Sequence, residues 1–359
     1  MNLFRMSNLG QVVATVQKNC HISDAQFAGD YTLCVFLLKM REFYRWENQI
    51  SFNGNLPRED VGRWMQEREQ MWEDLETSPF EPLPLDAHSF DPFDSASVNR
   101  TLVPRGYVYS AGYGRFNKPH FFLGALMRQE RRDDVTIYVS SCEYARDLVA
   151  PPAMTQGNTI YLRQESLRRY LWERIEEWRW NRNGEAMAHV LSGYDFEHGV
   201  DQALDRMTEA ETESVILHEL GEALAEKTLG EAWPCMLIDL SRSKAEIMAR
   251  AVRDLLADCL STLPGLIARQ DLPALHFYFA NFSGLRRHLF PEALAAYQQW
   301  LGNGRIQALE QLAASGQARW LDTAMQLIEL HQRHGEAAGP LIEALLENPP
   351  TCQILSAAQ

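Results

Sequence analysis

Residues 208–230 read TEAETESVILHELGEALAEKTLG. Thr208 and Glu211 have the spacing of a capping box, which favours the start of a helix. Gly230 suits the left-handed conformation in which many helices end. The stretch therefore predicts one long helix.

His218 and Glu222 lie four residues apart, so both side chains project from the same face of this helix. The small residues Gly221 and Ala225 lie on that face as well. One metal ion could be reached by His218 and Glu222 together, with Glu219 beside them to act on a metal-bound water. The spacing therefore predicts a site for a divalent metal ion.

The ten residues from Val215 to Leu224, VILHELGEAL, resemble the active-site helix of the zincin metalloproteases, whose pattern is HExxH. The resemblance implies that His218 and Glu222 bind the metal and that Glu219 is the general base of a hydrolase. The chain departs from the zincin pattern at Glu222, where zincins carry a second His. A carboxylate at this position suits iron or manganese as well as zinc, and loss of the metal altogether stays open.

A third ligand is expected from the helix that follows the motif, and Glu246 is the first choice. The resemblance implies this choice, because one type of zincin takes its third metal ligand from a Glu on the succeeding helix. Ser243 and Glu246 also form a capping box, in which the Glu246 carboxylate would instead reach back to the backbone of Ser243. Both interpretations stay open. Four weaker candidates for the site are Asp254 and Asp258 on the same helix, and Asp195 and His198 in the loop before the motif.

A second interpretation makes the motif helix structural. A helix with Glu213, Glu219, Glu222 and Glu226 is amphipathic in its own right, and His218 could be hydrogen-bonded at its edge. The chain would then be a non-catalytic helical interaction or scaffold protein. The first hypothesis remains a metal-dependent, hydrolase-like enzyme.

Strand patterns precede the motif helix at 106–113, 119–129, 135–141 and 158–163. Their short connections predict a small, partly antiparallel sheet. We expect an α+β protein that is mainly helical, in four parts. These are a helical segment (1–77, with helices at 24–48 and 57–76), a proline-rich acidic linker or strap (78–104), the small sheet (105–163) and a helical body with the HExxE motif (164–359).

The composition limits the classes of partner. The chain has 359 residues, and its 48 acidic and 34 basic side chains give a net charge of −14, which disfavours nucleic acid and anionic membranes. We find no leader with an apolar segment and no apolar run of about 18 residues, so a membrane span is not expected. Six scattered cysteines without CxxC spacing indicate a reduced, cytoplasmic protein. The expected ligands are a small molecule, a peptide or a protein partner.

Overall fold

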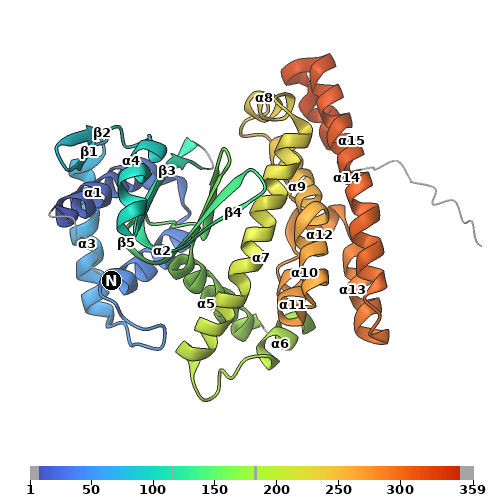
Figure 1. Cartoon of the computed structure of the whole chain (residues 1–359), viewed down its shortest axis with the longest axis horizontal. Coiled ribbons are helices and arrows are strands. Elements are labelled where there is room, and N and C mark those ends of the chain that lie inside the picture. Colours follow the sequence, from blue (N-terminus) through green and yellow to red (C-terminus); the bar gives the residue numbers. More distant parts are fainter. Residues whose placement is uncertain (1–7, 115–116, 182–183, 348–359) are drawn as a thin grey trace, which may run out of the picture. The chain divides into compact units, whose positions relative to one another are not determined.

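The computed structural model describes residues 8–114, 117–181 and 184–347, and the chain divides into two compact units. Unit 1 comprises Met1–Arg182 and Tyr194–Glu213, and unit 2 comprises Asn183–Gly193 and Ser214–Gln359. The fold is α+β and mainly helical, with its sheet before the motif helix, as predicted (Figure 1). None of the described helices combines the length and apolar character that a bilayer span requires.

A five-stranded sheet forms the centre of unit 1, in the order β3-β4-β5-β7-β6. The strands are β3 (Tyr107–Tyr113), β4 (Pro119–Arg132), β5 (Val135–Arg146), β6 (Ala153–Gln156) and β7 (Thr159–Arg163). Strands β5 and β7 are parallel, and the other neighbours are antiparallel. The prediction of a partly antiparallel sheet is confirmed. Strand β6 was not predicted, because its four half-buried residues show no alternation.

Helices α1 (Leu9–Phe27) and α4 (Ser95–Leu102) pack on one face of this sheet (Figure 1). Side chains alternate between the faces of a strand, so every second residue of the central strands meets these helices. The buried residues that form this layer are Val12, Val16 and Cys20 of α1, Val98 and Leu102 of α4, and Tyr109, Ala111, Phe121, Leu123 and Ala145 of the sheet. The apolar layer fixes α1 against β4 and β5.

Residues 78–104, predicted as a linker or strap, contain regular structure in addition to α4. A two-stranded ribbon, β1 (Leu83–Leu85) and β2 (His88–Phe90), pairs in antiparallel register. Leu83 and Leu85 are fully or almost fully buried in the core of unit 1. This ribbon has three residue pairs, too few for a strand signal among the prolines.

The helix predicted at 24–48 is two helices. Residues 24–27 are the end of α1, which stops at Phe27. Helix α2 (Leu33–Glu47) begins after a break in which the backbone of Tyr31 is extended. The prediction was wrong here because the apolar run from Leu33 concealed the break. Helix α3 (Arg58–Leu75) agrees with the prediction of 57–76. Aromatic contacts join α2 and α3, with the rings of Phe43 and Trp64 5.9 Å apart.

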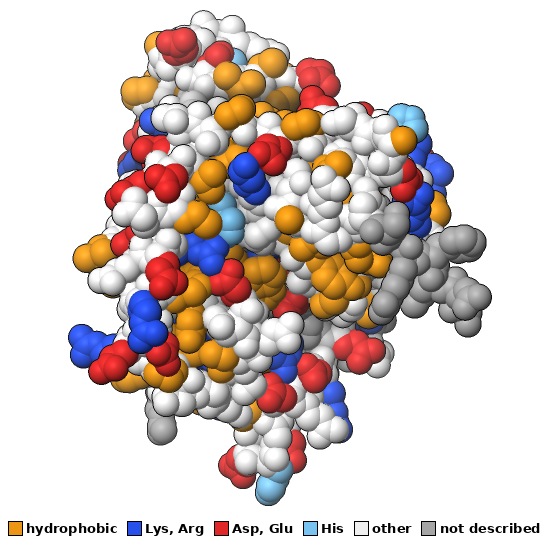
Figure 2. Space-filling model, turned by 90° about the vertical axis from the view of Figure 1, so that its left-hand side faces the viewer, with side chains coloured by type: hydrophobic (Ala, Val, Ile, Leu, Met, Phe, Trp, Pro, Cys, Tyr) orange, Lys and Arg blue, Asp and Glu red, His pale blue; other side chains and the backbone are white. Residues whose placement is uncertain are grey.

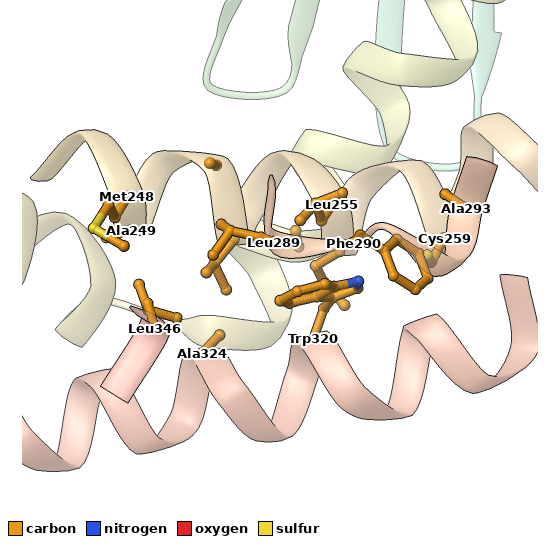
Figure 3. Packing of buried hydrophobic residues seen from close by; sticks show 14 of the residues in the cluster. Met248, Ala249, Leu255, Cys259, Leu289, Phe290, Ala293, Trp320, Ala324 and Leu346 are labelled. Atoms are coloured by element: carbon orange, nitrogen blue, oxygen red, sulfur yellow. The ribbon is translucent and has the colours of Figure 1, made fainter. Parts of the chain in front are cut away.

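Unit 2 is built from helices around one apolar core. They are α6 (Glu185–Ser192), α8 (Ala232–Asp239), α9 (Lys244–Ala257), α10 (Leu263–Arg269), α11 (Leu272–Ala280), α12 (Gly284–Leu289), α13 (Glu292–Asn303), α14 (Gln307–His334) and α15 (Gly339–Glu347). In Figure 3, Leu255 of α9 points toward Trp320 of α14, and the ring of Phe290 lies beside Trp320. Burial of each such side chain contributes roughly 1.5–3 kcal/mol.

Helix α7 (Val200–Leu229) carries the HExxE motif, and its first part belongs to unit 1 and its second part to unit 2. Helix α5 (Gln164–Asn181) precedes it in unit 1. Gly230 has a φ of 66° after the end of α7, as predicted. The prediction that Thr208 caps the helix was wrong. Thr208 lies inside α7, and its hydroxyl donates to the carbonyl of Leu204 at 2.7 Å.

Candidate functional site

Helices α7 and α9 approach each other closely at Gly221, within unit 2. A Cβ atom at Gly221 would lie 2.4 Å from the carbonyl oxygen of Ala257, so the helices could not pack this way around a larger residue. The approach places His218, one turn before Gly221, against Asp258, which follows Ala257. The motif therefore meets the end of the next long helix.

The imidazole of His218 lies between two carboxylates. Its Nδ1 is 3.0 Å from Oδ1 of Asp258, and its Nε2 is 3.5 Å from Oε1 of Glu222. Burial alone would lower the pKa of His218, but these two carboxylates raise it well above the usual imidazole value. His218 is therefore an imidazolium at neutral pH.

Glu222 is paired with an arginine as well as with His218. Its Oε1 accepts from Nη2 of Arg253 at 2.9 Å, and the same nitrogen lies 3.4 Å from Oδ1 of Asp254. Burial favours the protonated form of Glu222, but the hydrogen bond with His218 and the charge of Arg253 lower its pKa to about 2. Glu222 is thus a carboxylate across the physiological range.

Asp258 is 1% exposed and is the most enclosed member of this cluster. Its Oδ2 accepts from the hydroxyl of Tyr278 at 3.0 Å and from Nη1 of Arg286 at 2.9 Å. Burial works to raise the pKa of Asp258, but His218 and Arg286 hold it below the usual carboxylate value. Asp258 begins a π-helical turn, Asp258–Thr262, a rare conformation that often occurs at functional sites.

Glu246, the predicted third metal ligand, does not join His218 and Glu222. Its backbone N–H donates to Oγ of Ser243 at 3.1 Å, and its Oε2 accepts from the backbone N–H of Arg242 at 2.7 Å. Its other oxygen accepts from Nε of Arg250 at 2.9 Å. Glu246 therefore stabilises the start of α9 in a capping role, although its carboxylate binds the backbone of Arg242 and not that of Ser243 as the capping box predicted.

The remaining candidates divide between the two units. Asp254 and Asp258 lie in the cluster of unit 2, whereas Asp195 and His198 lie in unit 1. Oδ1 of Asp195 is 2.8 Å from Nδ1 of His198, and both side chains are largely exposed. Burial lowers the pKa of Arg253, but the charges of Glu222 and Asp254 raise it above the usual value. Glu219 makes a smaller contribution in the same direction through its charge.

Sequence reasoning missed three members of the cluster, Arg253, Tyr278 and Arg286. Each comes from a helix other than α7, and none belongs to a motif that would mark it. Together with His218, Glu222 and Asp258 they form an ion-pair network of alternating charge. The cationic groups are the imidazolium of His218 and the guanidinium groups of Arg253 and Arg286.

This network does not fit a metal ion. In residues 8–114, 117–181 and 184–347, no group of three or more His, Cys, Asp or Glu side chains is arranged to hold one. Both ring nitrogens of His218 face carboxylate oxygens, Nδ1 that of Asp258 at 3.0 Å and Nε2 that of Glu222 at 3.5 Å. Arg253 and Arg286 already neutralise Glu222 and Asp258. The donors expected from the motif are engaged with one another.

Unit 1 contains a pocket of about 1220 Å³. Its walls come from α1, α2 and residues 49–52 after it, β4, β5, α5 and the part of α7 that belongs to unit 1. Apolar and aromatic side chains such as Val13, Trp46, Phe52 and Tyr144 line it together with charged groups. Ligand pockets commonly combine apolar walls with a few polar groups, and this volume accommodates a small molecule. No motif in the sequence marked this pocket.

Comparison with known proteins gives a family. Residues 11–163 match the DUF6866 N-terminal domain, and residues 168–349 match the DUF6866 C-terminal domain, both described as a family of unknown function. The chain belongs to this family. No curated protein and no solved structure matches the chain.

The boundary between the two DUF6866 domains differs from the division into compact units. The DUF6866 C-terminal domain begins at Arg168, within α5, but α5 and the first part of α7 belong to unit 1. The walls of the pocket in unit 1 therefore contain residues of both DUF6866 domains. The HExxE network lies within the C-terminal one.

Proposed function

We propose that this protein binds a small molecule in the pocket of unit 1 and that its HExxE helix is structural. The pocket of about 1220 Å³ is the observation that carries the proposal, because its size and mixed lining suit a ligand. The charged network of unit 2 supports the second part, since each of its carboxylates already has a cationic partner on the chain.

Two catalytic alternatives receive less support from the same geometry. A zincin-like hydrolase requires a neutral imidazole on the metal, but the ring nitrogens of His218 lie 3.0 Å from a carboxylate oxygen of Asp258 and 3.5 Å from one of Glu222, which favour the charged imidazolium. A His–Asp pair acting as a general base also requires a neutral imidazole, with its second nitrogen directed at the substrate. Glu222 occupies that direction. The network is better suited to hold α7, α9, α11 and α12 together.

The structural role of the motif is tested by elemental analysis of the full-length, tag-free protein after growth with added zinc, iron and manganese. We expect far less than one equivalent of any transition metal, with the same result for His218→Ala. About one equivalent of metal that disappears in His218→Ala would overturn this part of the proposal.

The pocket is tested with Nile red, an uncharged dye whose fluorescence rises in apolar surroundings. Ala14 is an exposed residue of α1 that lines the pocket, so Ala14→Trp should fill the space without disturbing the core. Ala318 is a similarly exposed residue of α14 in unit 2, and Ala318→Trp is the matched control. Saturable binding that only Ala14→Trp removes is the expected result. Equal binding by both variants would contradict the proposal.

A further inference from the structure

Arg146 is a buried cation in the wall of the pocket. It is the last residue of β5, and its side chain is 1% exposed. Its guanidinium carbon lies 5.1 Å from the ring centre of Trp46 and 5.6 Å from that of Phe43. The aromatic rings hold the guanidinium in place and give it an attractive but weak partner.

Two nitrogens of Arg146 lack a hydrogen-bond partner in the described part of the chain. These are Nε and Nη2, both of which are buried. The remaining nitrogen, Nη1, lies 3.9 Å from Oε2 of Glu143, which is beyond hydrogen-bond distance. Burial lowers the pKa of Arg146 to about 10, and the nearby charge of Arg169 acts in the same direction. A buried charge with unused donors is costly unless something pairs with it.

The two unused nitrogens are the pair that binds a carboxylate side-on. In a guanidinium, the N–H groups of Nε and Nη2 point in parallel and match the two oxygens of a carboxylate. The same unit shows this arrangement filled, because Nε and Nη2 of Arg163 donate to the two oxygens of Glu143 at 3.0 and 2.7 Å. Arg146 has the donors of Arg163 without the acceptor.

Most of the other charged groups of the pocket already have partners on the chain, although one nitrogen of Arg169, Nε, is also buried without one. The clearest pairs are Glu42 with Arg45, Glu47 with Arg68, and both Asp201 and Asp205 with Arg168. Arg169 donates to Glu173 and to the carbonyls of Val149 and Ala150. Arg146 lines the pocket with two donors unused, and a carboxylate in the pocket would pair with these buried nitrogens once the side chain turns toward it.

The lining also limits the kind of anion. Seven carboxylate side chains and four guanidinium groups line the pocket, so a doubly charged phosphate would meet more repulsion than a singly charged carboxylate. The apolar surfaces of Trp46 and Phe52 suit a flat hydrocarbon group attached to that carboxylate. Charge and shape thus point to one chemical class.

We infer that the pocket of unit 1 binds an aromatic carboxylic acid, whose carboxylate is held by Nε and Nη2 of Arg146 and whose ring lies against Trp46. The inference rests on the proposed binding function and names the class of ligand. It does not depend on the network in unit 2.

Isothermal titration calorimetry with the full-length protein tests this assignment with three probes, which are indole acetate, its uncharged analogue indole acetamide, and inorganic phosphate. We expect indole acetate to bind saturably, at least about tenfold tighter than the amide, because the amide forfeits the charge-assisted bonds. Phosphate should bind more weakly than indole acetate. Equal affinity for the acid and the amide, or tighter binding of phosphate, would overturn the inference.

Two Arg→Lys variants provide a matched comparison. Arg146→Lys keeps the charge but loses the parallel N–H groups, so indole acetate should bind about tenfold more weakly. Arg168 lines the same pocket, but its Nε and Nη2 are already bound to Asp205 and Asp201, so Arg168→Lys should change the affinity by no more than about twofold. Unchanged affinity in Arg146→Lys would contradict the assignment.

The probes separate failure of this inference from failure of the proposed function. Should Nile red bind in the pocket while indole acetate does not bind, the carboxylate assignment falls and the binding function stands. Should neither bind, both are rejected. The comparison of acid with amide uses the wild-type protein alone, so it remains decisive even where a variant does not fold.

Discussion

Oδ1 of Asp258 lies 3.0 Å from Nδ1 of His218, although 40 residues separate them in the chain. The contact joins a residue of the motif helix to the first residue of a π-helical turn. It is supported by the close approach of α7 and α9 at Gly221 and by the second pairing of Asp258 with Arg286. The stability of unit 2 should therefore depend on this carboxylate.

Asp258→Asn should lower the free energy of unfolding by about 3 kcal/mol, because it removes a buried anion that partners both His218 and Arg286. Chemical denaturation of the full-length protein measures the effect. Asp195→Asn is the matched control, since Asp195 also pairs with a histidine but is exposed. Equal losses in the two variants would show that the buried network contributes little.

The network should make stability depend on pH above neutrality. The pKa of His218 is raised in the folded protein, so its contribution is complete below the usual imidazole pKa of about 6.5 and is lost as pH rises through the folded value. The free energy of unfolding of the wild type should fall over this alkaline range relative to His218→Gln. A constant difference between the two proteins from neutral to alkaline pH would contradict the raised pKa.

Two glycines in helices should respond oppositely to alanine. Gly221→Ala places a methyl group against the backbone of Ala257 and should destabilise the protein by about 2 kcal/mol. Gly62 lies inside α3 with no atom within 4 Å of the added methyl, so Gly62→Ala should stabilise by roughly 0.5–1 kcal/mol. Thermal denaturation compares the two variants. A neutral Gly221→Ala would mean that α7 and α9 are not in close contact.

Glu246→Gln should cost about 1 kcal/mol, because Glu246 stabilises the first turn of α9 through Arg242 and Arg250. The change should leave the pKa of His218 where it is, since Glu246 does not contact that imidazole. Histidine signals followed by NMR during a pH titration provide the measurement. A shift of the His218 titration would place Glu246 in the network after all.

The sequence predicts the helix of the motif and the shared face of His218 and Glu222, because a spacing of four residues brings side chains together in any helix, but it assigned them to a metal ion and not to each other. It does not predict that Arg253 or Arg286 neutralises the carboxylates. Those contacts depend on how closely α7 approaches α9, and that distance is set by packing at Gly221. The contact of Asp258 with His218 depends on the same approach, so the sequence indicates Asp258 only as one of the weaker candidates for the metal site.

The pocket shows a similar limit. The strand predicted at 135–141 stops short of Arg146, where β5 ends, and an arginine at a strand end is usually solvated. Only the folded chain shows that its Nε and Nη2 are enclosed without a partner. Local patterns determine which element a residue joins, and the presence or absence of a partner arises from residues distant in sequence.

The passage of α7 through both units limits how the protein can be divided. A fragment that stops at Arg163, the end of the N-terminal family match, retains the sheet but lacks α5 and residues 194–213 of unit 1. It would display unpaired apolar surface on β5, so aggregation is the expected fate of such a fragment. A cut after Glu213 would instead sever an uninterrupted helix. Neither cut therefore yields a fragment that keeps a whole compact unit together with all of its helices intact.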